Sequence, residues 1–217
     1  IRRMYHEQES VFYYLTLYNE NYAMPPMPDG VAESIVRGLY RLQSRDGKAG
    51  SPRAQLLGSG PILREVLRAQ DMLAERYAIA SDVWSVTSYK ELRRDAMAAE
   101  RWNRLHPTET PRSCHLWKAI EGVDGPFIAA SDYMRLVSEQ IAPWLPGGLV
   151  ALGTDGFGRS ETREALRRHF EVDAECVVVA TLAALAKRGE AGVTREAVAE
   201  AIRDLGVDPD KVDPVVA

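Results

Sequence analysis

The chain has 217 residues, of which 46% are hydrophobic and 27% are charged. These proportions are ordinary for a globular protein and exclude a disordered, collagen-like or low-complexity chain. The formal net charge of −4 at pH 7 excludes the overall positive field that draws proteins onto nucleic acid or acidic lipid. We therefore expect no nucleic-acid partner and no membrane partner.

The first residues lack the features of a targeting segment. The chain opens with Ile1 rather than Met, and neither an apolar core region nor a cleavage site follows. The longest apolar stretch, residues 176–186, is shorter than the roughly 20 residues that span a bilayer, so it predicts a core helix. We expect the chain to be a piece cut from a longer polypeptide.

The first 52 residues predict a strand, a linker and a helix. Residues 11–18 are rich in aromatic and β-branched side chains and predict a buried strand. Three of residues 25–28 are proline, which removes backbone donors and favours an extended linker. Apolar residues at 31, 35, 39 and 42 have helical spacing, and a polar link follows. The expected parts are residues 1–30, a connecting helix and link over 31–52, and a main domain over 53–217.

The main domain alternates strands with helices, a pattern typical of an α/β fold with a mainly parallel sheet covered by helices on both faces. Strands are expected over residues 54–57, 82–87, 126–130 and 149–152. The helices are expected to follow capping residues, namely Ser59 with Pro61, Ser88 with Glu91, Ser131 or Asp132, Ser160, Asp173 and Thr194.

Two glycine-containing loops are candidate anion sites. Gly58 and Gly60 lie between a strand and a helix, where backbone amides can approach a phosphate. A dinucleotide site requires Gly or Ala three residues after the second glycine, but this chain has Leu63 there, which favours a plain turn.

The second loop is residues 153–160, whose Gly156, Gly158, Arg159 and Ser160 form a possible anion site. The alternative is that its glycines adopt positive φ angles and Ser160 caps the next helix. Asp155 opposes an anionic ligand. We favour the structural interpretation and keep the anion site open.

The other reactive residue types form no recognisable catalytic or metal-binding pattern. The two cysteines are far apart and lack CxxC spacing, which suits a reducing cytosol rather than a disulfide framework or zinc site. No serine stands in a GxSxG sequence, and the histidines lack metal-binding spacing. We expect packing, capping or ion-pair roles for these residues, which are Cys114, Cys176, His6, His106, His115, His169, Ser59, Ser131, Ser160, Arg93, Arg94, Arg163, Arg167 and Arg168.

Several segments, in order along the chain, closely resemble the C-terminal end of the homodimeric bacterial pyruvate dehydrogenase (acetyl-transferring) component. They include LGTDGFGRS at residues 152–160 and RRHFEVDA at residues 167–174. The remaining matches are YNENY at 18–22, LLGSG at 56–60, DVWSVTS at 82–88 and ERWN at 100–103 with His106-Pro107. The resemblance covers nearly the whole chain.

This resemblance implies a homodimeric, cytoplasmic enzyme that uses thiamine diphosphate and Mg²⁺ to decarboxylate pyruvate. It also implies transfer of the acetyl group to lipoyl groups on a partner dihydrolipoyl acyltransferase. The implied domain order is that of transketolase, with residues 1–30 the end of the pyrimidine domain and its linker, and residues 53–217 a transketolase C-terminal-like domain.

The residues with which that family binds the metal and performs catalysis would lie before Ile1. No catalytic, cofactor-binding or metal-binding residue is therefore carried onto this chain. Each Asp-Gly pair here also lacks the leading Gly of the family's Gly-Asp-Gly cofactor motif. We expect the chain alone to be inactive, to bind no cofactor and to serve dimer assembly.

Two other hypotheses stay open from the residues. One is a self-standing α/β module that binds an anionic regulator at the glycine loop 153–160. The other is an oxidoreductase with its own dinucleotide site, which Leu63 weakens.

Overall fold

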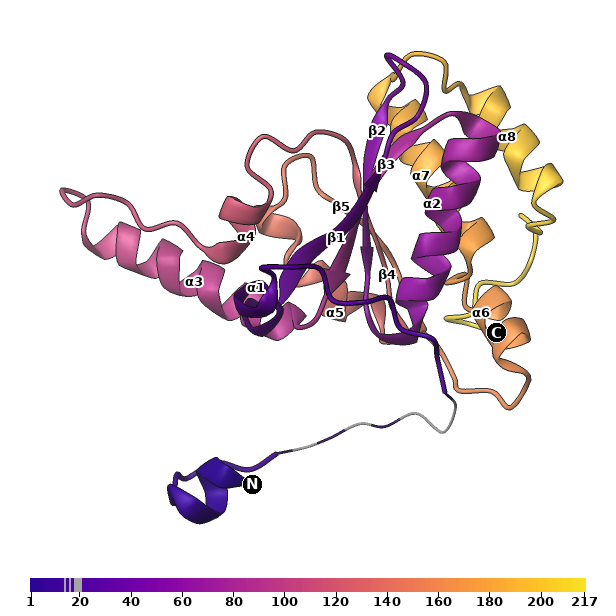
Figure 1. Ribbon diagram of the computed structural model, residues 1–217. Coiled ribbons are helices and arrows are strands. Elements are labelled where there is room, and N and C mark those ends of the chain that lie inside the picture. Colours follow the sequence, from indigo (N-terminus) through magenta and orange to yellow (C-terminus); the bar gives the residue numbers. More distant parts are fainter. Residues whose placement is uncertain (14, 16, 18–20) are drawn as a thin grey trace.

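The centre of the protein is a five-stranded sheet of order β1-β3-β2-β4-β5, seen in a computed structural model that describes residues 1–13, 15, 17 and 21–217 (Figure 1). The strands are β1 (Leu39–Arg45), β2 (Arg53–Gly58), β3 (Ala80–Val86), β4 (Phe127–Ala130) and β5 (Leu149–Leu152). Strands β2 to β5 are parallel, and β1 pairs with β3 in the antiparallel direction. The mainly parallel sheet and its four predicted strands are confirmed.

Helices α2 (Leu63–Tyr77), α7 (Ala174–Arg188) and α8 (Arg195–Asp204) cover one face of the sheet (Figure 1). Because alternate residues of a strand point to opposite faces, Leu56 and Ile128 are buried under these helices. Helix α7 packs on α2 and also contacts β4 and β5, so the two helices lie side by side on this face.

The opposite face is covered by α3 (Tyr89–Leu105), α4 (His115–Ala119), α5 (Arg135–Glu139) and the short 3-10 turn η3 (Ala142–Trp144). Leu57, Trp84 and Phe127 are buried here against Leu92 and Leu116. Both faces of the parallel strands are therefore apolar, as a sheet between two helical layers requires.

Three of the predicted helix starts are confirmed by their caps. The side chains of Ser88, Asp173 and Thr194 accept hydrogen bonds from the amides of Glu91, Cys176 and Ala197. Each bond satisfies an amide that has no partner within the helix.

Two predicted caps are wrong. Helix α6 (Arg163–His169) starts after Thr162, whose hydroxyl accepts from the Ala165 amide, and Ser160 lies outside the helix. Thr162 offers the same kind of hydroxyl two residues nearer the helix, so it takes the capping position. Helix α5 likewise starts later than expected, because the Ser131 hydroxyl accepts from the Tyr133 amide in a turn before it.

The connecting helix expected from residue 31 is much shorter in the structure. Helix α1 (Ala32–Arg37) ends at Gly38, whose φ of 104° is left-handed. A Cβ at Gly38 would lie 2.5 Å from the carbonyl oxygen of Ser88, so only glycine fits this approach. Leu39 and Leu42, expected in the helix, belong to β1, and the sheet therefore begins before residue 53.

The buried strand expected over residues 11–18 is wrong for the residues of this stretch that the structure describes, and residues 14, 16 and 18 lie outside the description. Phe12, Leu15 and Leu17 are 86%, 78% and 89% exposed and belong to no strand. In Figure 1 the chain leads away from the body to a π-helical turn, η1 (Arg2–His6). No strand in the described ranges lies alongside to supply hydrogen bonds. Residues 1–31 are called the upstream segment below.

Candidate functional site

The candidate site lies at the carboxyl edge of the parallel strands. Strand β3 lies on one side of β2 and β4 on the other, and their connections cover opposite faces of the sheet. Such a reversal of strand order opens a crevice at the strand ends, where α/β proteins bind ligands. Here the Ser59 hydroxyl donates to the Ser131 hydroxyl at 2.9 Å, which ties the loops that follow β2 and β4.

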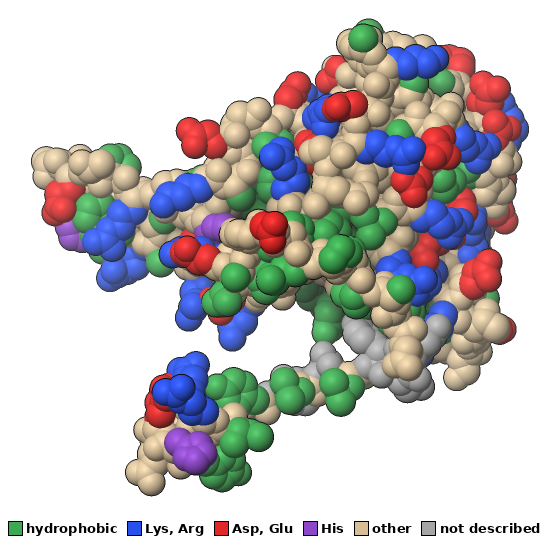
Figure 2. Space-filling view, viewed as in Figure 1, with side chains coloured by type: hydrophobic (Ala, Val, Ile, Leu, Met, Phe, Trp, Pro, Cys, Tyr) green, Lys and Arg blue, Asp and Glu red, His purple; other side chains and the backbone are tan. Residues whose placement is uncertain are grey.

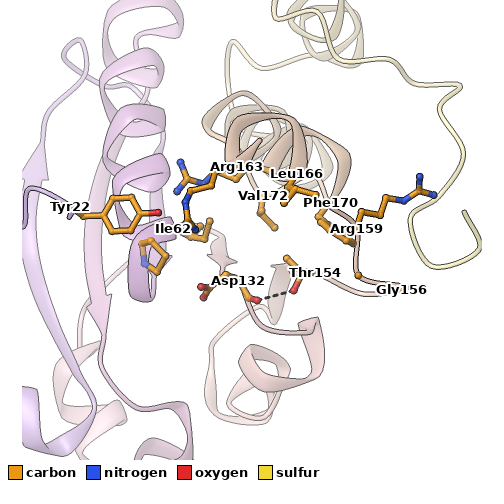
Figure 3. A pocket seen from close by; sticks show the side chains of 13 residues that line it. Tyr22, Ile62, Asp132, Thr154, Gly156, Arg159, Arg163, Leu166, Phe170 and Val172 are labelled. Carbon is orange, nitrogen blue, oxygen red and sulfur yellow. Dashed lines mark hydrogen bonds between the residues drawn. The ribbon is translucent and has the colours of Figure 1, made fainter. Parts of the chain in front are cut away.

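A cavity of about 290 Å³ opens at this edge, between the start of α2 and helix α6 (Figure 3). Its walls are largely apolar, and the apolar side chains are Pro61, Ile62, Leu166, Phe170 and Val172. Polar groups reach it from three further places: Asp132 after β4, Thr154 after β5, and Arg163 and Arg167 on α6. The Thr154 hydroxyl donates to the Asp132 carbonyl oxygen at 2.8 Å, the dashed line in Figure 3.

Among the described residues of the upstream segment, Tyr22 lines this cavity, and Figure 3 shows its ring beside Ile62. Two guanidinium groups lie near the ring, that of Arg64 at 5.2 Å from the ring centroid and that of Arg167 at 6.0 Å. Cations at these distances are attracted by the negative face of an aromatic ring. The upstream segment therefore contacts the body of the protein at this cavity.

Glu65 fixes the position of Arg167, one of the arginines that line the cavity. Its side chain is 11% exposed and accepts hydrogen bonds from Arg167 at 2.9 Å, from Arg68 at 3.1 Å and from the Ala174 amide at 3.2 Å. A buried carboxylate needs such partners to offset the loss of hydration. Glu65 thereby joins α2, α6 and the first turn of α7.

Glu65 and Tyr22 were not among the site residues predicted from the sequence. Glu65 lies among the buried, mostly apolar residues of α2. An acidic residue on the apolar side of a predicted helix is unusual, and this pattern could have identified Glu65 from the sequence.

The structure places the predicted anion loop at the rim of this cavity, but its residues do not converge. Gly156, Gly158 and Arg159 all line the cavity, but the Arg159 side chain extends away from Tyr22 and Arg163 in Figure 3. Ser160 is exposed and lines a neighbouring hollow instead.

The two glycines of that loop differ in their backbone conformation and in the space available for a side chain. Gly156 has a φ of 104°, and a Cβ there would lie 2.1 Å from the carbonyl oxygen of Pro214. Gly158 has no left-handed φ and faces open space. The neighbouring Asp155 accepts two hydrogen bonds from Arg135, at 2.8 and 3.2 Å. Anion binding at this loop stays a prediction.

The first glycine loop packs tightly rather than forming a phosphate cradle. A Cβ at Gly58 would lie 2.8 Å from the Cα atom of Leu63, so the glycine lets β2 approach the start of α2. The Cδ1 atom of Leu63 would lie 2.9 Å from the same Cβ, so the glycine also makes room for this side chain. These contacts fit the plain turn that the sequence favoured.

Several of the remaining candidates have structural contacts. His106 stacks on Trp102, and the Nε2 atom of His115 lies 2.8 Å from the Leu39 carbonyl oxygen. Burial raises the pKa of the Cys114 and Cys176 thiols, which disfavours the reactive thiolate. Within residues 1–13, 15, 17 and 21–217, no group of three or more His, Cys, Asp or Glu side chains could hold a metal ion.

No helix in the described part of the chain is both long enough and apolar enough to cross a membrane.

Comparison with known proteins identifies relatives of this fold. Residues 38–173 match the family model of the transketolase-like TK C-terminal domain. The pyruvate dehydrogenase E1 component of Cupriavidus necator is 51% identical over 215 residues, which cover 99% of this chain and 24% of that protein. The corresponding protein of Escherichia coli K12 is 51% identical over 219 residues, with 100% and 24% covered.

Among solved structures, a transketolase from Leishmania mexicana is 19% identical, with a TM-score of 0.46 over 77% of this chain and 21% of that one. This likeness is too weak to carry an argument.

The chain thus spans about a quarter of the length of the curated relatives that it matches. The family match covers more than half of the chain, from β1 to the start of α7. The chain therefore belongs to the family of transketolase-like TK C-terminal domains.

Proposed function

We propose that this chain is the C-terminal part of a thiamine diphosphate-dependent pyruvate dehydrogenase E1 component. That enzyme oxidatively decarboxylates pyruvate in the cytoplasm and acetylates the lipoyl groups of a dihydrolipoyl acyltransferase. The observation that carries the proposal is the identity of about half of all residues over the full span of the chain to proteins of that name.

Within this enzyme, residues 1–30 are the end of the pyrimidine domain and its linker, and the remainder serves assembly of a homodimer. Large apolar side chains that remain exposed at the carboxyl edge support this role. They include Phe157, 82% exposed, and Leu136, 62% exposed. Hydrophobic side chains also gather in Figure 2 around α1, α5 and the linker that leads to α1. Apolar surface of this kind marks a contact with another domain or subunit.

The residues present do not fit a thiamine diphosphate and Mg²⁺ site. Mg²⁺ requires a near-octahedral set of oxygen ligands that includes one or two carboxylates. Asp155, the acid of the glycine loop, is bound by Arg135, and the Thr154 hydroxyl is bound to the Asp132 carbonyl oxygen. We therefore assign the cofactor and the active centre to parts of the enzyme outside this chain.

The proposal is tested with the complete polypeptide from which this chain comes. We expect it to decarboxylate pyruvate in the presence of thiamine diphosphate, Mg²⁺ and an artificial electron acceptor. An inactive but folded and cofactor-replete polypeptide would refute the assigned activity.

A second test uses the chain of 217 residues alone. Isothermal titration with thiamine diphosphate and Mg²⁺ should give no dissociation constant below about 1 mM, which corresponds to roughly 4 kcal/mol of binding. Tighter binding would mean that this chain contains a cofactor site.

A further inference from the structure

We propose that the cavity at the carboxyl edge is a docking site for residues 21–31 of the chain's own upstream segment, with Tyr22 as the anchoring side chain. The assignment of that segment to an upstream domain rests on the proposed function. The docking itself depends only on contacts within this chain.

Tyr22 differs from its neighbours in its contact with the body. Asn21, Ala23 and Met24 are exposed, whereas Tyr22 is partly buried and lines the cavity. Its ring lies near guanidinium groups from two different helices, Arg64 of α2 and Arg167 of α6. One side chain therefore connects the upstream segment to both walls of the cavity.

One arginine of the cavity wall, Arg167, is held by contacts other than Tyr22. Arg167 is 18% exposed at its side chain and donates to Glu65, which also accepts from the amide of Ala174. These bonds leave Arg167 little freedom to turn toward solvent. A side chain that is already held in this way loses little further conformational entropy when a ring docks against it.

The charges at the cavity have both signs. The Asp132 carboxylate and the Arg163 guanidinium both reach the cavity in Figure 3, and Arg159 and Arg167 also line it. A peptide segment offers both donors and acceptors to such a wall, and a free phosphate is the competing occupant that the experiment below includes.

The linker favours docking in cis. Tyr22 is joined to α1 by residues 23–31, of which three are proline. A short tether gives the segment an effective concentration on the order of millimolar at the cavity. A molecule free in solution at micromolar concentration should therefore not displace it.

This competition provides the experiment. A fluorescent synthetic peptide of residues 15–28 is titrated into the full chain and into the Tyr22→Ala chain, and binding is followed by anisotropy. We expect saturable binding to the Tyr22→Ala chain and at least tenfold weaker binding to the unaltered chain, whose cavity is occupied by its own segment.

Matched variants test the contacts. In the Tyr22→Ala background, Arg64→Ala should weaken peptide binding severalfold, because its guanidinium lies against the ring. Arg76→Ala removes another exposed arginine of the same helix, one that lies over the Tyr77 ring, and should leave binding unchanged. A peptide with Tyr22→Phe should bind better than one with Tyr22→Leu, since only the aromatic ring attracts a cation.

Three outcomes would overturn the inference. They are absence of peptide binding to the Tyr22→Ala chain, equal binding to both chains, and binding that ignores the residue at peptide position 22. Inorganic phosphate that binds the Tyr22→Ala chain and prevents binding of the peptide would instead assign the cavity to a diffusible anion. None of these measurements involves pyruvate or thiamine diphosphate, so failure here and failure of the proposed function are distinguishable.

Discussion

Similar apolar side chains are buried in the sheet and exposed in the upstream segment. Leu56 and Leu57 on β2 are at most 1% exposed, whereas Leu15 and Leu17 are 78% and 89% exposed. Both stretches have strand-like composition, but only β2 lies between two strands that satisfy its backbone groups. For these two stretches, the strand-like residues are buried where neighbouring strands also pair with their backbone.

The largest expected difference follows directly from this contrast. Leu56→Ala should reduce the free energy of unfolding by about 2–5 kcal/mol, because it leaves a cavity between the sheet and its helices. Leu15→Ala should change it by less than about 0.5 kcal/mol. Urea unfolding followed by circular dichroism measures both, and similar losses at the two sites would show that the upstream segment is buried in solution.

The second prediction compares two glycines of one loop. Gly156→Ala should cost about 1–3 kcal/mol, since it forces a left-handed φ on alanine and places its Cβ against the Pro214 carbonyl. Gly158→Ala should cost under about 0.5 kcal/mol, because that position is open and not left-handed. Thermal unfolding of the two variants measures both losses of stability. A larger loss for Gly158→Ala than for Gly156→Ala would contradict the loop geometry.

The same loop offers a test of the anion site. If the loop is structural, phosphate should show no saturable micromolar binding, and Arg159→Ala should have little effect on stability. Micromolar binding that Arg159→Ala abolishes would establish the anion site instead.

The third prediction concerns association. We expect the isolated chain to self-associate at tens of micromolar, because the upstream segment exposes Phe12, Leu15 and Leu17 together. Replacing all three with serine should lower the weight-average mass in sedimentation equilibrium. Val36→Ser, at a 77% exposed position on α1, is the control and should have a smaller effect. A monomer in every case would refute the prediction.

The smallest expected effect is a decrease in the free energy of unfolding at alkaline pH, caused by the buried Cys176 thiol of α7. Burial raises the pKa of the Cys176 thiol above its ordinary value near 9. The unfolded chain therefore loses this proton at lower pH than the folded chain, and the free energy of unfolding falls as the pH rises above about 9.

Urea midpoints at pH 8 and pH 10 test this dependence. Cys176→Ala should reduce the difference between the two midpoints. Cys114→Ala should reduce it less, since the Trp117 amide donates to that sulfur and opposes the rise in its pKa. An unchanged difference in Cys176→Ala would contradict the assigned cause.

The parts of the fold that the sequence predicted well are those with local physical signals. Ser88, Asp173 and Thr194 precede apolar helical patterns and cap them as expected. The four parallel strands were found because apolar runs between turn residues are typical of strands buried on both faces.

The errors arise where distant residues decide the structure. The spacing of Leu39 and Leu42 fits a helix, but Gly38 ends α1 and the open edge of β3 takes these residues into a strand. The burial of Glu65 depends on partners about a hundred residues away, Arg167 and the Ala174 amide. A single sequence carries no direct record of such contacts.

The direction of β1 decides which side of the domain meets the preceding polypeptide. Leu39, its first residue, pairs with Val86 at the carboxyl end of β3, and Arg45, its last, pairs with Ser81 near the other end. A seven-residue strand spans roughly 20 Å, so a parallel first strand would have begun about that far from the cavity. By running against its neighbour, β1 brings the polypeptide in at the rim where the crossovers of the other strands begin. The antiparallel direction of one edge strand thus determines the edge of the sheet at which residues 1–38 enter the domain.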